Sequence, residues 1–264
     1  MSENLVDKGD RGFYHKKNPL NDLTGKEWIY FTNSMLETDF ENEEDFNNWL
    51  NYISDSVIDT RYSTSGEDSF EHKSRKQHPT PKPPQLMRDL IAFFTKEGEL
   101  VLDPFMGVGG TLIGASLINR KAIGIDLDKK YIDIYKEVSK KLGLNVQKAY
   151  VKDASKLDKI KLLSETQVDA IITDPPYANM MSKAKTGGDK TKKSQIGSTT
   201  PFTENQNDIG NLDYFDFLDS LKTIIEKSLV YLKDKGYLVL FTKDLQPTKD
   251  HHNMLHSDIV EKFS

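Results

Sequence analysis

The ten residues from Val168 to Tyr177 join an apolar run to groups that could hold an amine. Residues 168–173 are typical of a buried strand, and they end at the tetrapeptide Asp174, Pro175, Pro176 and Tyr177. The proline rings fix their backbone φ angles, so the carbonyl groups around them point in set directions. An ionised Asp174 only accepts hydrogen bonds, and Tyr177 offers a flat aromatic face. Together these residues could bind an exocyclic amine and stack on the base that carries it.

A second apolar run, upstream of the first, ends at an acid and a glycine-rich turn. Residues 100–103 finish at Asp103, and the turn that follows holds Gly107, Gly109 and Gly110 before a predicted helix. Glycines permit a tight turn close to a ligand, and the N-terminus of a helix favours negative groups. Asp126 ends the next apolar run, 19 residues after Gly107. This offset is near the ~20 residues at which an acid meets a ribose hydroxyl in nucleotide-binding units.

The elements that must position these motifs alternate along the chain from residue 83. Apolar runs of strand length occupy residues 100–103, 121–126, 148–152, 168–173 and 237–241. The segments between them have helical spacing, including one face of Leu86, Leu90, Phe93 and Phe94, a helix over about 128–142, and a helix through Phe217 to Leu229 that ends at Lys235-Gly236. Alternation of this kind predicts an α/β fold with a doubly wound, mostly parallel sheet. Its ligands are expected at the carboxyl edge of the strands.

The two motifs resemble those of the DNA amino-methyltransferases, which move a methyl group from S-adenosylmethionine to adenine N6 or cytosine N4. Residues 103–111 are similar to the family's cofactor motif, and Asp174-Pro-Pro-Tyr177 to its catalytic motif. The segment from His78 to Pro84 is similar to the one that precedes the cofactor motif in this family. The resemblance covers roughly residues 75–245, in the order of a permuted relative. It implies a Rossmann-like sheet of the S-adenosylmethionine-dependent methyltransferase type.

The resemblance also implies roles for single residues. The cofactor is expected against the turn residues Asp103, Phe105, Gly107 and Gly109. Asp126 would accept hydrogen bonds from the ribose, and Asp153 from the adenine amine of the cofactor. Thr80 and Lys82 would lie near the cofactor's carboxylate. Two alternatives stay open: Asp153 could be a simple helix cap, and Lys82 could be a solvated lysine.

At the catalytic motif, the expected chemistry is placement of a base amine. Asp174 would accept one amine hydrogen and the carbonyl of Pro175 the other, which localises the nitrogen lone pair. Tyr177 would stack on a target base that has left the duplex. Because the methyl group on a sulfonium is already activated, positioning supplies most of the catalysis, and no metal is expected.

We therefore expect a site-specific DNA methyltransferase that acts on adenine N6, in a modification or phage system. Adenine is favoured because an acidic Asp-Pro-Pro-Tyr is more usual for adenine than for cytosine. Three alternatives remain, namely cytosine-N4 methylation of DNA, guanine-N2 methylation of RNA, and a non-catalytic cofactor-binding remnant or subunit.

A long segment without regular apolar spacing, residues 178–213, follows the catalytic motif. Between residues 183 and 193 it holds a single acid, Asp189, among the five lysines Lys183, Lys185, Lys190, Lys192 and Lys193. Long loops in compact domains are usually functional or disordered. We expect these lysines to attract nucleic-acid phosphates, with a solvated charged loop as the alternative.

Composition and chain ends bound the remaining expectations. The net charge of −5 argues mildly against tight autonomous DNA binding, and the absence of cysteine fits a cytoplasmic protein. No apolar run is long enough to cross a membrane. Residues 1–77 are expected to be a polar and helical segment that packs on the core, with an aromatic patch at Trp28–Thr32 and an amphipathic helix at 43–53. Residues 78–264 form the methyltransferase domain.

The last predicted strand, residues 237–241, reads as an interior strand that is apolar on both faces, yet no later segment reads as its partner. The domain is therefore expected to lack its last strands. Either the chain is a truncated gene product, or the N-terminal segment, a second polypeptide or a dimer completes the sheet, and the chain alone is expected to be a weak or inactive methyltransferase.

Overall fold

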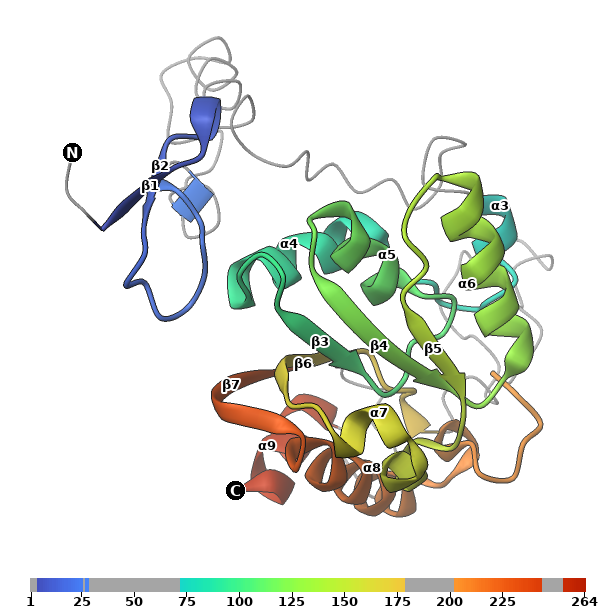
Figure 1. Ribbon diagram of the computed structural model, residues 1–264. Helices are drawn as coiled ribbons and strands as arrows, with labels where there is room; N and C mark the ends of the chain where they lie inside the picture. Colours follow the sequence, from blue (N-terminus) through green and yellow to red (C-terminus); the bar gives the residue numbers. More distant parts are fainter. Residues whose placement is uncertain (1–3, 26, 29–71, 179–201, 244–253) are drawn as a thin grey trace, which may run out of the picture.

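The protein folds into a five-stranded parallel sheet with helices on both faces (Figure 1). The computed structural model describes residues 4–25, 27–28, 72–178, 202–243 and 254–264. The sheet contains β3 (Leu100–Asp103), β4 (Lys121–Asp126), β5 (Lys148–Val151), β6 (Val168–Thr173) and β7 (Leu232–Leu240). The strand order is β5-β4-β3-β6-β7, and every pairing among these strands is parallel. The predicted α/β, doubly wound, Rossmann-like sheet is confirmed.

Alternate residues of the central strands pack against helices on opposite faces of the sheet. Val101 and Ile172 contribute to a core with α4 (Pro84–Phe94), α5 (Gly110–Leu117) and α6 (Lys129–Lys141). Leu102 and Ile171 point to the other face, towards η3 (Ala154–Lys159) and α7 (Lys161–Ser164). On that second face lie also α8 (Tyr214–Leu229) and α9 (Leu255–Phe263). Because all strands run the same way, Asp103, Asp126 and Asp174 meet at one edge.

Helix α4 uses a different face from the one that its apolar spacing predicts. Met87 and Ile91 are fully buried against the sheet. Phe93 and Phe94 are only half-buried, and they contact aromatic rings outside the core: Trp28 stacks on Phe93, and Tyr237 lies beside Phe94. The predicted face therefore lies at the margin of the core: Phe94 packs against the core cluster, while Phe93 meets the ring of Trp28.

Strand β7 corrects two predictions. Helix α8 ends at Leu229, so Lys235 and Gly236 do not close it but lie within an irregular part of the strand. Val168 pairs with Leu232 and Ala170 with Tyr237, so four residues of β7 oppose a single residue of β6. Lys235 in this stretch has a φ of 63°. Among the described residues β7 is an edge strand, and Tyr237 is 39% exposed, so the expected burial on both faces is wrong.

The C-terminal helix α9 was not predicted, because few apolar residues mark it. Leu255 and Ile259, four positions apart, are buried in the cluster that α8 also lines. The Tyr214 hydroxyl at the start of α8 donates to Asp258, and Lys222 Nζ donates to the carbonyl oxygen of Lys262 at 2.8 Å. These contacts fix α9 against α8.

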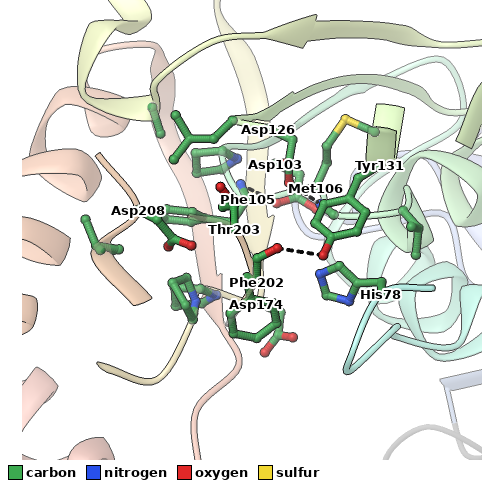
Figure 2. Close-up of a pocket in the computed structure, with 18 of the residues that line it drawn as sticks. His78, Asp103, Phe105, Met106, Asp126, Tyr131, Asp174, Phe202, Thr203 and Asp208 are labelled. Carbon is green, nitrogen blue, oxygen red and sulfur yellow. Dashed lines mark hydrogen bonds between the residues drawn. The ribbon is translucent and has the colours of Figure 1, made fainter. Parts of the chain in front are cut away.

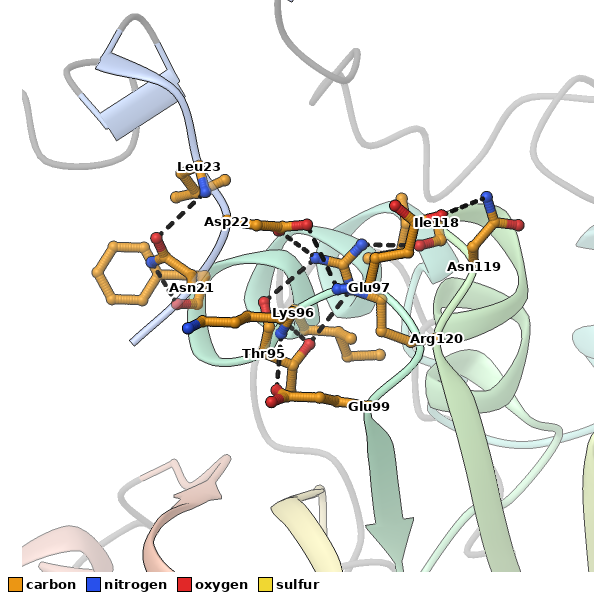
Figure 3. Close-up of polar contacts among 12 residues, drawn as sticks. Asn21, Asp22, Leu23, Thr95, Lys96, Glu97, Glu99, Ile118, Asn119 and Arg120 are labelled. Atoms are coloured by element: carbon orange, nitrogen blue, oxygen red, sulfur yellow. Dashed lines mark hydrogen bonds and ion pairs between the residues drawn. The ribbon is translucent and has the colours of Figure 1, made fainter. Parts of the chain in front are cut away.

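The N-terminal segment begins with a small hairpin and then docks on the main domain. Strands β1 (Leu5–Asp7) and β2 (Phe13–His15) pair antiparallel. After them, Asp22 accepts a hydrogen bond from Arg120 Nη2 at 2.6 Å, and both residues are buried (Figure 3). Burial opposes ionisation of Asp22, but the positive charges of Arg120 and Lys8 hold its pKa below the ordinary value.

A second contact of this segment surrounds the end of α4. Asn21 Nδ2 donates to the carbonyl oxygen of Phe93 at 2.7 Å, and the ring of Trp28 stacks on Phe93 at 5.6 Å between centroids. Trp28 therefore packs as the sequence suggested for residues 28–32. The rest of that patch and the helix expected at 43–53 lie outside the described residues.

Candidate active site

A pocket opens at the carboxyl ends of β3, β4 and β6 (Figure 2). Most of its lining comes from residues within six segments, 78–82, 103–111, 126–131, 152–154, 174–177 and 202–209, and Met87 and Ile224 complete it. Eleven of the residues singled out in the sequence are among the lining: Thr80, Lys82, Asp103, Phe105, Gly107, Asp126, Asp153, Asp174, Pro175, Pro176 and Tyr177. The expected cofactor motif and the expected catalytic motif therefore share one cavity.

Asp103 ties the turn, the central strands and α5 together. Its Oδ1 accepts hydrogen bonds from the Phe105 N–H at 3.0 Å and the Thr173 hydroxyl at 2.5 Å. Its Oδ2 accepts from the Thr111 hydroxyl at 2.5 Å. Burial raises the pKa of Asp103 to about 6, although these hydrogen bonds act to lower it. The Asp103 carboxylate is thus hydrogen-bonded to residues of the protein itself, and these bonds fix the shape of the turn.

The glycines of the turn are used differently. Gly107 has a φ of 49°, and a Cβ there would lie 3.0 Å from His78 Nε2, so the backbone passes close to the ring. Gly109 has a φ of 75°, and a Cβ there would lie 2.2 Å from the ring of Tyr135. Gly109 is outside the pocket lining, so what the structure shows at this position is tight packing against α6.

Asp126 closes the turn from the end of β4. Its Oδ2 accepts from the Gly107 N–H at 2.9 Å, and its Oδ1 from the Asp128 N–H at 2.8 Å. Burial raises the pKa of Asp126 to about 7, although both N–H groups oppose the shift. Each carboxylate oxygen has a second lone pair, so the side chain can still accept from a ligand.

Asp153 follows β5 and caps a helix. Its Oδ1 accepts from the Ser155 N–H at 2.8 Å at the start of η3, and its Oδ2 lies 3.4 Å from Lys156 Nζ. Burial opposes ionisation, but these partners lower the pKa of Asp153 overall. The capping alternative is confirmed, while the residue also lines the pocket.

The segment before the turn crosses the pocket and is held by Arg75. Arg75 Nη2 donates to the carbonyl oxygen of Lys82 at 2.5 Å, and burial lowers the pKa of Arg75 to about 10. The ring of His78 lies between Tyr131, at 4.7 Å between centroids, and Phe202, at 5.2 Å. Burial lowers the pKa of His78 to about 4, so the ring is neutral at pH 7, and its Nδ1 accepts from the Thr80 N–H at 3.3 Å.

Asp174, the acid of the expected catalytic motif, has two partners from its own chain. Tyr177 Oη donates to Asp174 Oδ1 at 2.6 Å, and Lys82 Nζ lies 2.7 Å from Asp174 Oδ2. Burial raises the pKa of Asp174, against the charge of Lys82 and both hydrogen bonds. The pKa of Tyr177 is raised by burial and by the neighbouring carboxylate. Lys82, expected near the cofactor's carboxylate or in solvent, thus pairs with the acid of the catalytic motif.

Sequence reasoning missed the residues at the end of the long segment that close the pocket. The Tyr131 hydroxyl donates to the carbonyl oxygen of Phe202 at 2.8 Å, and Asp208 lines the wall nearby. Their one signal in the sequence is their place between the catalytic motif and α8. The five lysines at 183–193 lie outside the described residues.

Two further features bound the chemistry. Within the described ranges, no group of three or more histidine, aspartate or glutamate side chains is placed to hold a metal ion. No helix in the same ranges is both long and apolar enough to span a lipid bilayer.

Comparison with known proteins agrees with this arrangement. Residues 13–137 match the family model N6_N4_Mtase, described as DNA methylase. This part of the chain is similar to the DNA amino-methyltransferases. Residues 90–194 of the chain also match the model UPF0020, described as an RMKL-like methyltransferase domain. The cofactor of the family is S-adenosylmethionine.

Three relatives show how far the similarity extends. The Type II methyltransferase M.HpaI of Haemophilus parainfluenzae is 46% identical over 66 residues, which are 25% of this chain and 21% of the relative. A tRNA (guanine(10)-N2)-dimethyltransferase of Methanocaldococcus jannaschii is 34% identical over 141 residues, 50% of this chain and 38% of the relative. The Type II methyltransferase M2.DpnII of Streptococcus pneumoniae is 31% identical over 126 residues, 46% and 47% respectively. The chain thus spans less than half the length of each of these relatives.

Proposed function

We propose that this chain methylates the exocyclic amine of a nucleic-acid base, with adenine N6 of DNA as the favoured target in a modification or phage system. One observation carries the proposal. Asp174 and the carbonyl group of Pro175 lie in the same pocket as Asp126 and Gly107. Acceptors suited to an amine therefore face the turn expected to hold the methyl donor.

The residues of the turn suit S-adenosylmethionine. The backbone at Phe105 and Gly107 would line the amino-acid end, with Thr80 beside it, and Asp126 would accept from the ribose hydroxyls. The acids of the pocket complement the positive charge of the sulfonium and ammonium groups. When bound, this cofactor supplies an activated methyl group.

The catalytic motif would bind and orient the amine. Asp174 accepts one amine hydrogen through a lone pair that Tyr177 and Lys82 leave free, and the Pro175 carbonyl accepts the other. Pro176 fixes the backbone at this point, and the ring of Tyr177 stacks on the base. The ammonium group of Lys82 keeps Asp174 ionised, which matters because a protonated carboxyl would lose acceptor capacity.

Guanine N2 of RNA is a second candidate. It is favoured by the relative from Methanocaldococcus jannaschii, which carries tRNA guanine in its name and matches half of this chain. An acceptor-only carboxylate fits the amines of adenine, cytosine and guanine alike. Cytosine N4 of DNA and a non-catalytic cofactor-binding subunit complete the alternatives.

Methyl transfer from labelled S-adenosylmethionine to unmethylated DNA and to unmodified tRNA separates these candidates. The proposal predicts N6-methyladenine in digested DNA, detected by mass spectrometry of the nucleosides. N4-methylcytosine in DNA, N2-methylguanine in tRNA, or no transfer by a protein that binds the cofactor would each assign the function to an alternative.

Segments outside the pocket have proposed roles as well. Residues 1–77 would act as a docked extension of the methyltransferase domain at 78–264. The lysines at 183–193 would bind nucleic-acid phosphates, and a partner polypeptide or a second copy would cover the edge of β7. A cytoplasmic location accords with a DNA substrate.

A further inference from the structure

Asp208 lines the pocket, and one of its carboxylate oxygens has no hydrogen-bond partner among the described residues (Figure 2). The residue is 5% exposed, and its Oδ1 accepts from the Gly210 N–H at 2.8 Å. Its Oδ2 is buried and accepts no hydrogen bond from any residue that the structure describes. Burial raises the pKa of Asp208, while the N–H groups of Gly210 and Thr203 oppose the shift. Leaving a buried acceptor unpaired is costly, so an oxygen of this kind in a pocket points to a donor on a ligand.

The position of Asp208 is fixed by contacts on two sides of the pocket. On one side, the Tyr131 hydroxyl from α6 holds the carbonyl group of Phe202, whose ring lies against His78. On the other side, a Cβ at Gly210 would lie 2.9 Å from the Cβ of Pro176, so the backbone packs directly on the catalytic motif. Asp208 also caps η6 (Ile209–Asn211) with its Oδ1. The unpaired oxygen is therefore held in place rather than left free to turn to solvent.

The surroundings indicate what kind of donor this is. Ala154, Ile209 and Ile224 contribute apolar wall to the same pocket. An apolar wall with one acceptor at its edge suits a flat heterocycle that carries an amine, because a carboxylate accepts from an amine but repels a carbonyl oxygen. Asp153, the acid expected to bind the adenine amine, already has partners on both oxygens, Ser155 and Lys156.

We propose that Asp208 Oδ2 accepts a hydrogen bond from the exocyclic amine of a nucleobase bound in the pocket, which adds a base-recognising residue to the proposed function on which it rests. Two bases could bring this amine, the adenine of the cofactor and the target base. Ala154, which follows the acid expected to bind the cofactor's adenine, lies in the same apolar cluster as Ile209, and this favours the cofactor adenine.

Calorimetry with two cofactor probes tests the cofactor source without needing turnover. S-adenosylhomocysteine carries the amine, and S-inosylhomocysteine carries a carbonyl oxygen at that position. Wild type should bind the adenosyl probe about tenfold more tightly or better. Asp208→Asn keeps an acceptor for Gly210 but turns a donor towards the ligand, so it should reverse or abolish this preference.

Asp208→Ser guards against a folding failure, because serine still caps η6 and lacks only the second oxygen. This variant should bind S-adenosylhomocysteine more weakly than wild type does, and S-inosylhomocysteine with the same affinity. Asp216→Asn, an exposed acid in the first turn of α8, is the matched control and should behave as wild type. Thermal melting of each variant checks that it is folded.

The target-base source is tested on the protein saturated with S-adenosylhomocysteine, titrated with adenosine, cytidine, guanosine and inosine. If the Asp208 variants keep the adenosyl preference but lose binding of the amine-bearing nucleosides, the amine comes from the target base. If folded variants retain both the cofactor preference and nucleoside binding, the proposal is overturned. These experiments measure binding and need no methyl transfer. A protein that fails to methylate nucleic acid can therefore still confirm or overturn the role of Asp208.

Discussion

Lys82 Nζ lies 2.7 Å from Asp174 Oδ2, which joins the segment before the cofactor turn to the acid of the catalytic motif. Both side chains are partly exposed, at 26% and 16%, so the pair borders the pocket rather than lying beneath it. Burial favours the protonated form of Asp174, and the ammonium group of Lys82 favours the ionised form. Because of this ion pair, the ionisation of Asp174 depends on the position of residues 78–82, and the position of Lys82 depends on the charge of Asp174.

Replacing Lys82 by methionine should shift the pH profile of methyl transfer. Without the ammonium group, burial raises the pKa of Asp174 further, so activity should fall at neutral pH and recover as the pH rises. The measurement is kcat against pH for Lys82→Met, with Lys76→Met, an exposed lysine of the same segment, as control. An unchanged profile would show that Lys82 does not set the ionisation of Asp174.

Tyr177 should act more through its ring than through its hydroxyl. Tyr177→Phe removes the 2.6 Å hydrogen bond to Asp174 Oδ1 but keeps the stacking face, so kcat should fall by less than about tenfold. Tyr177→Ala removes both and should be far more damaging. Equal losses in the two variants, measured by single-turnover transfer, would contradict a stacking role.

Cofactor binding should release a proton near pH 6. The pKa of Asp126 is about 7 in the unliganded protein, so its carboxyl group is mostly protonated below that pH. Ribose hydroxyls donate best to the ionised form, and binding should expel about one proton at pH 6 and almost none at pH 8. Calorimetry in buffers with different ionisation enthalpies measures this number, and Asp126→Ala should abolish the release. Equal heats in all buffers at pH 6 would rule the linkage out.

The same pKa shift predicts how stability depends on pH. The folded-state pKa values of Asp126 and Asp103, about 7 and about 6, lie above the ordinary value of 3.8. Between pH 4 and pH 7 the folded protein therefore binds more protons than the unfolded chain. The contribution of both residues to the free energy of unfolding falls as the pH rises through this range. Urea unfolding of the unliganded protein should give a lower free energy at pH 8 than at pH 5, after correction with an Asp126→Ala variant. A stability contribution that rises over this range would contradict the burial of these groups.

The N-terminal segment should be fastened by its buried ion pair. Asp22→Ala leaves the buried Arg120 without its carboxylate, and breaking such a pair costs about 3–5 kcal/mol. Asp7→Ala, in the β1 strand of the hairpin, is the comparison variant. Limited proteolysis should release residues 1–28 faster in Asp22→Ala, and equal protection would mean that the pair does not hold the segment.

Much of the site could be predicted because parallel strands bring their ends to one edge. Asp103, Asp126 and Asp174 each end an apolar run, and that pattern alone places all three around a single pocket. The partners of these acids could not be predicted, since Lys82 and Asp174 are 92 residues apart and meet only in the folded chain. Asp208 follows a long polar segment in which no spacing distinguishes one acid from another.

Elements that depend on neighbours were also hard to predict. The apolar run at 237–241 looks interior, but whether a strand is interior or at an edge depends on what pairs beside it. Helix α9 rests on two buried residues, Leu255 and Ile259, too few to stand out from a polar background. Gly109 belongs to a ligand motif by sequence, yet its close neighbour is the Tyr135 ring.

The most direct test of the account compares wild type with Asp174→Ala in two assays on the same preparation. Calorimetry should give both proteins similar affinity for S-adenosylmethionine, because the turn residues and Asp126 are unchanged. Mass spectrometry of DNA treated with deuterium-labelled cofactor should find labelled N6-methyladenine with wild type and none with Asp174→Ala. Transfer by Asp174→Ala at the wild-type rate, or no transfer to any nucleic acid by a folded wild type that binds the cofactor, would contradict the central claim.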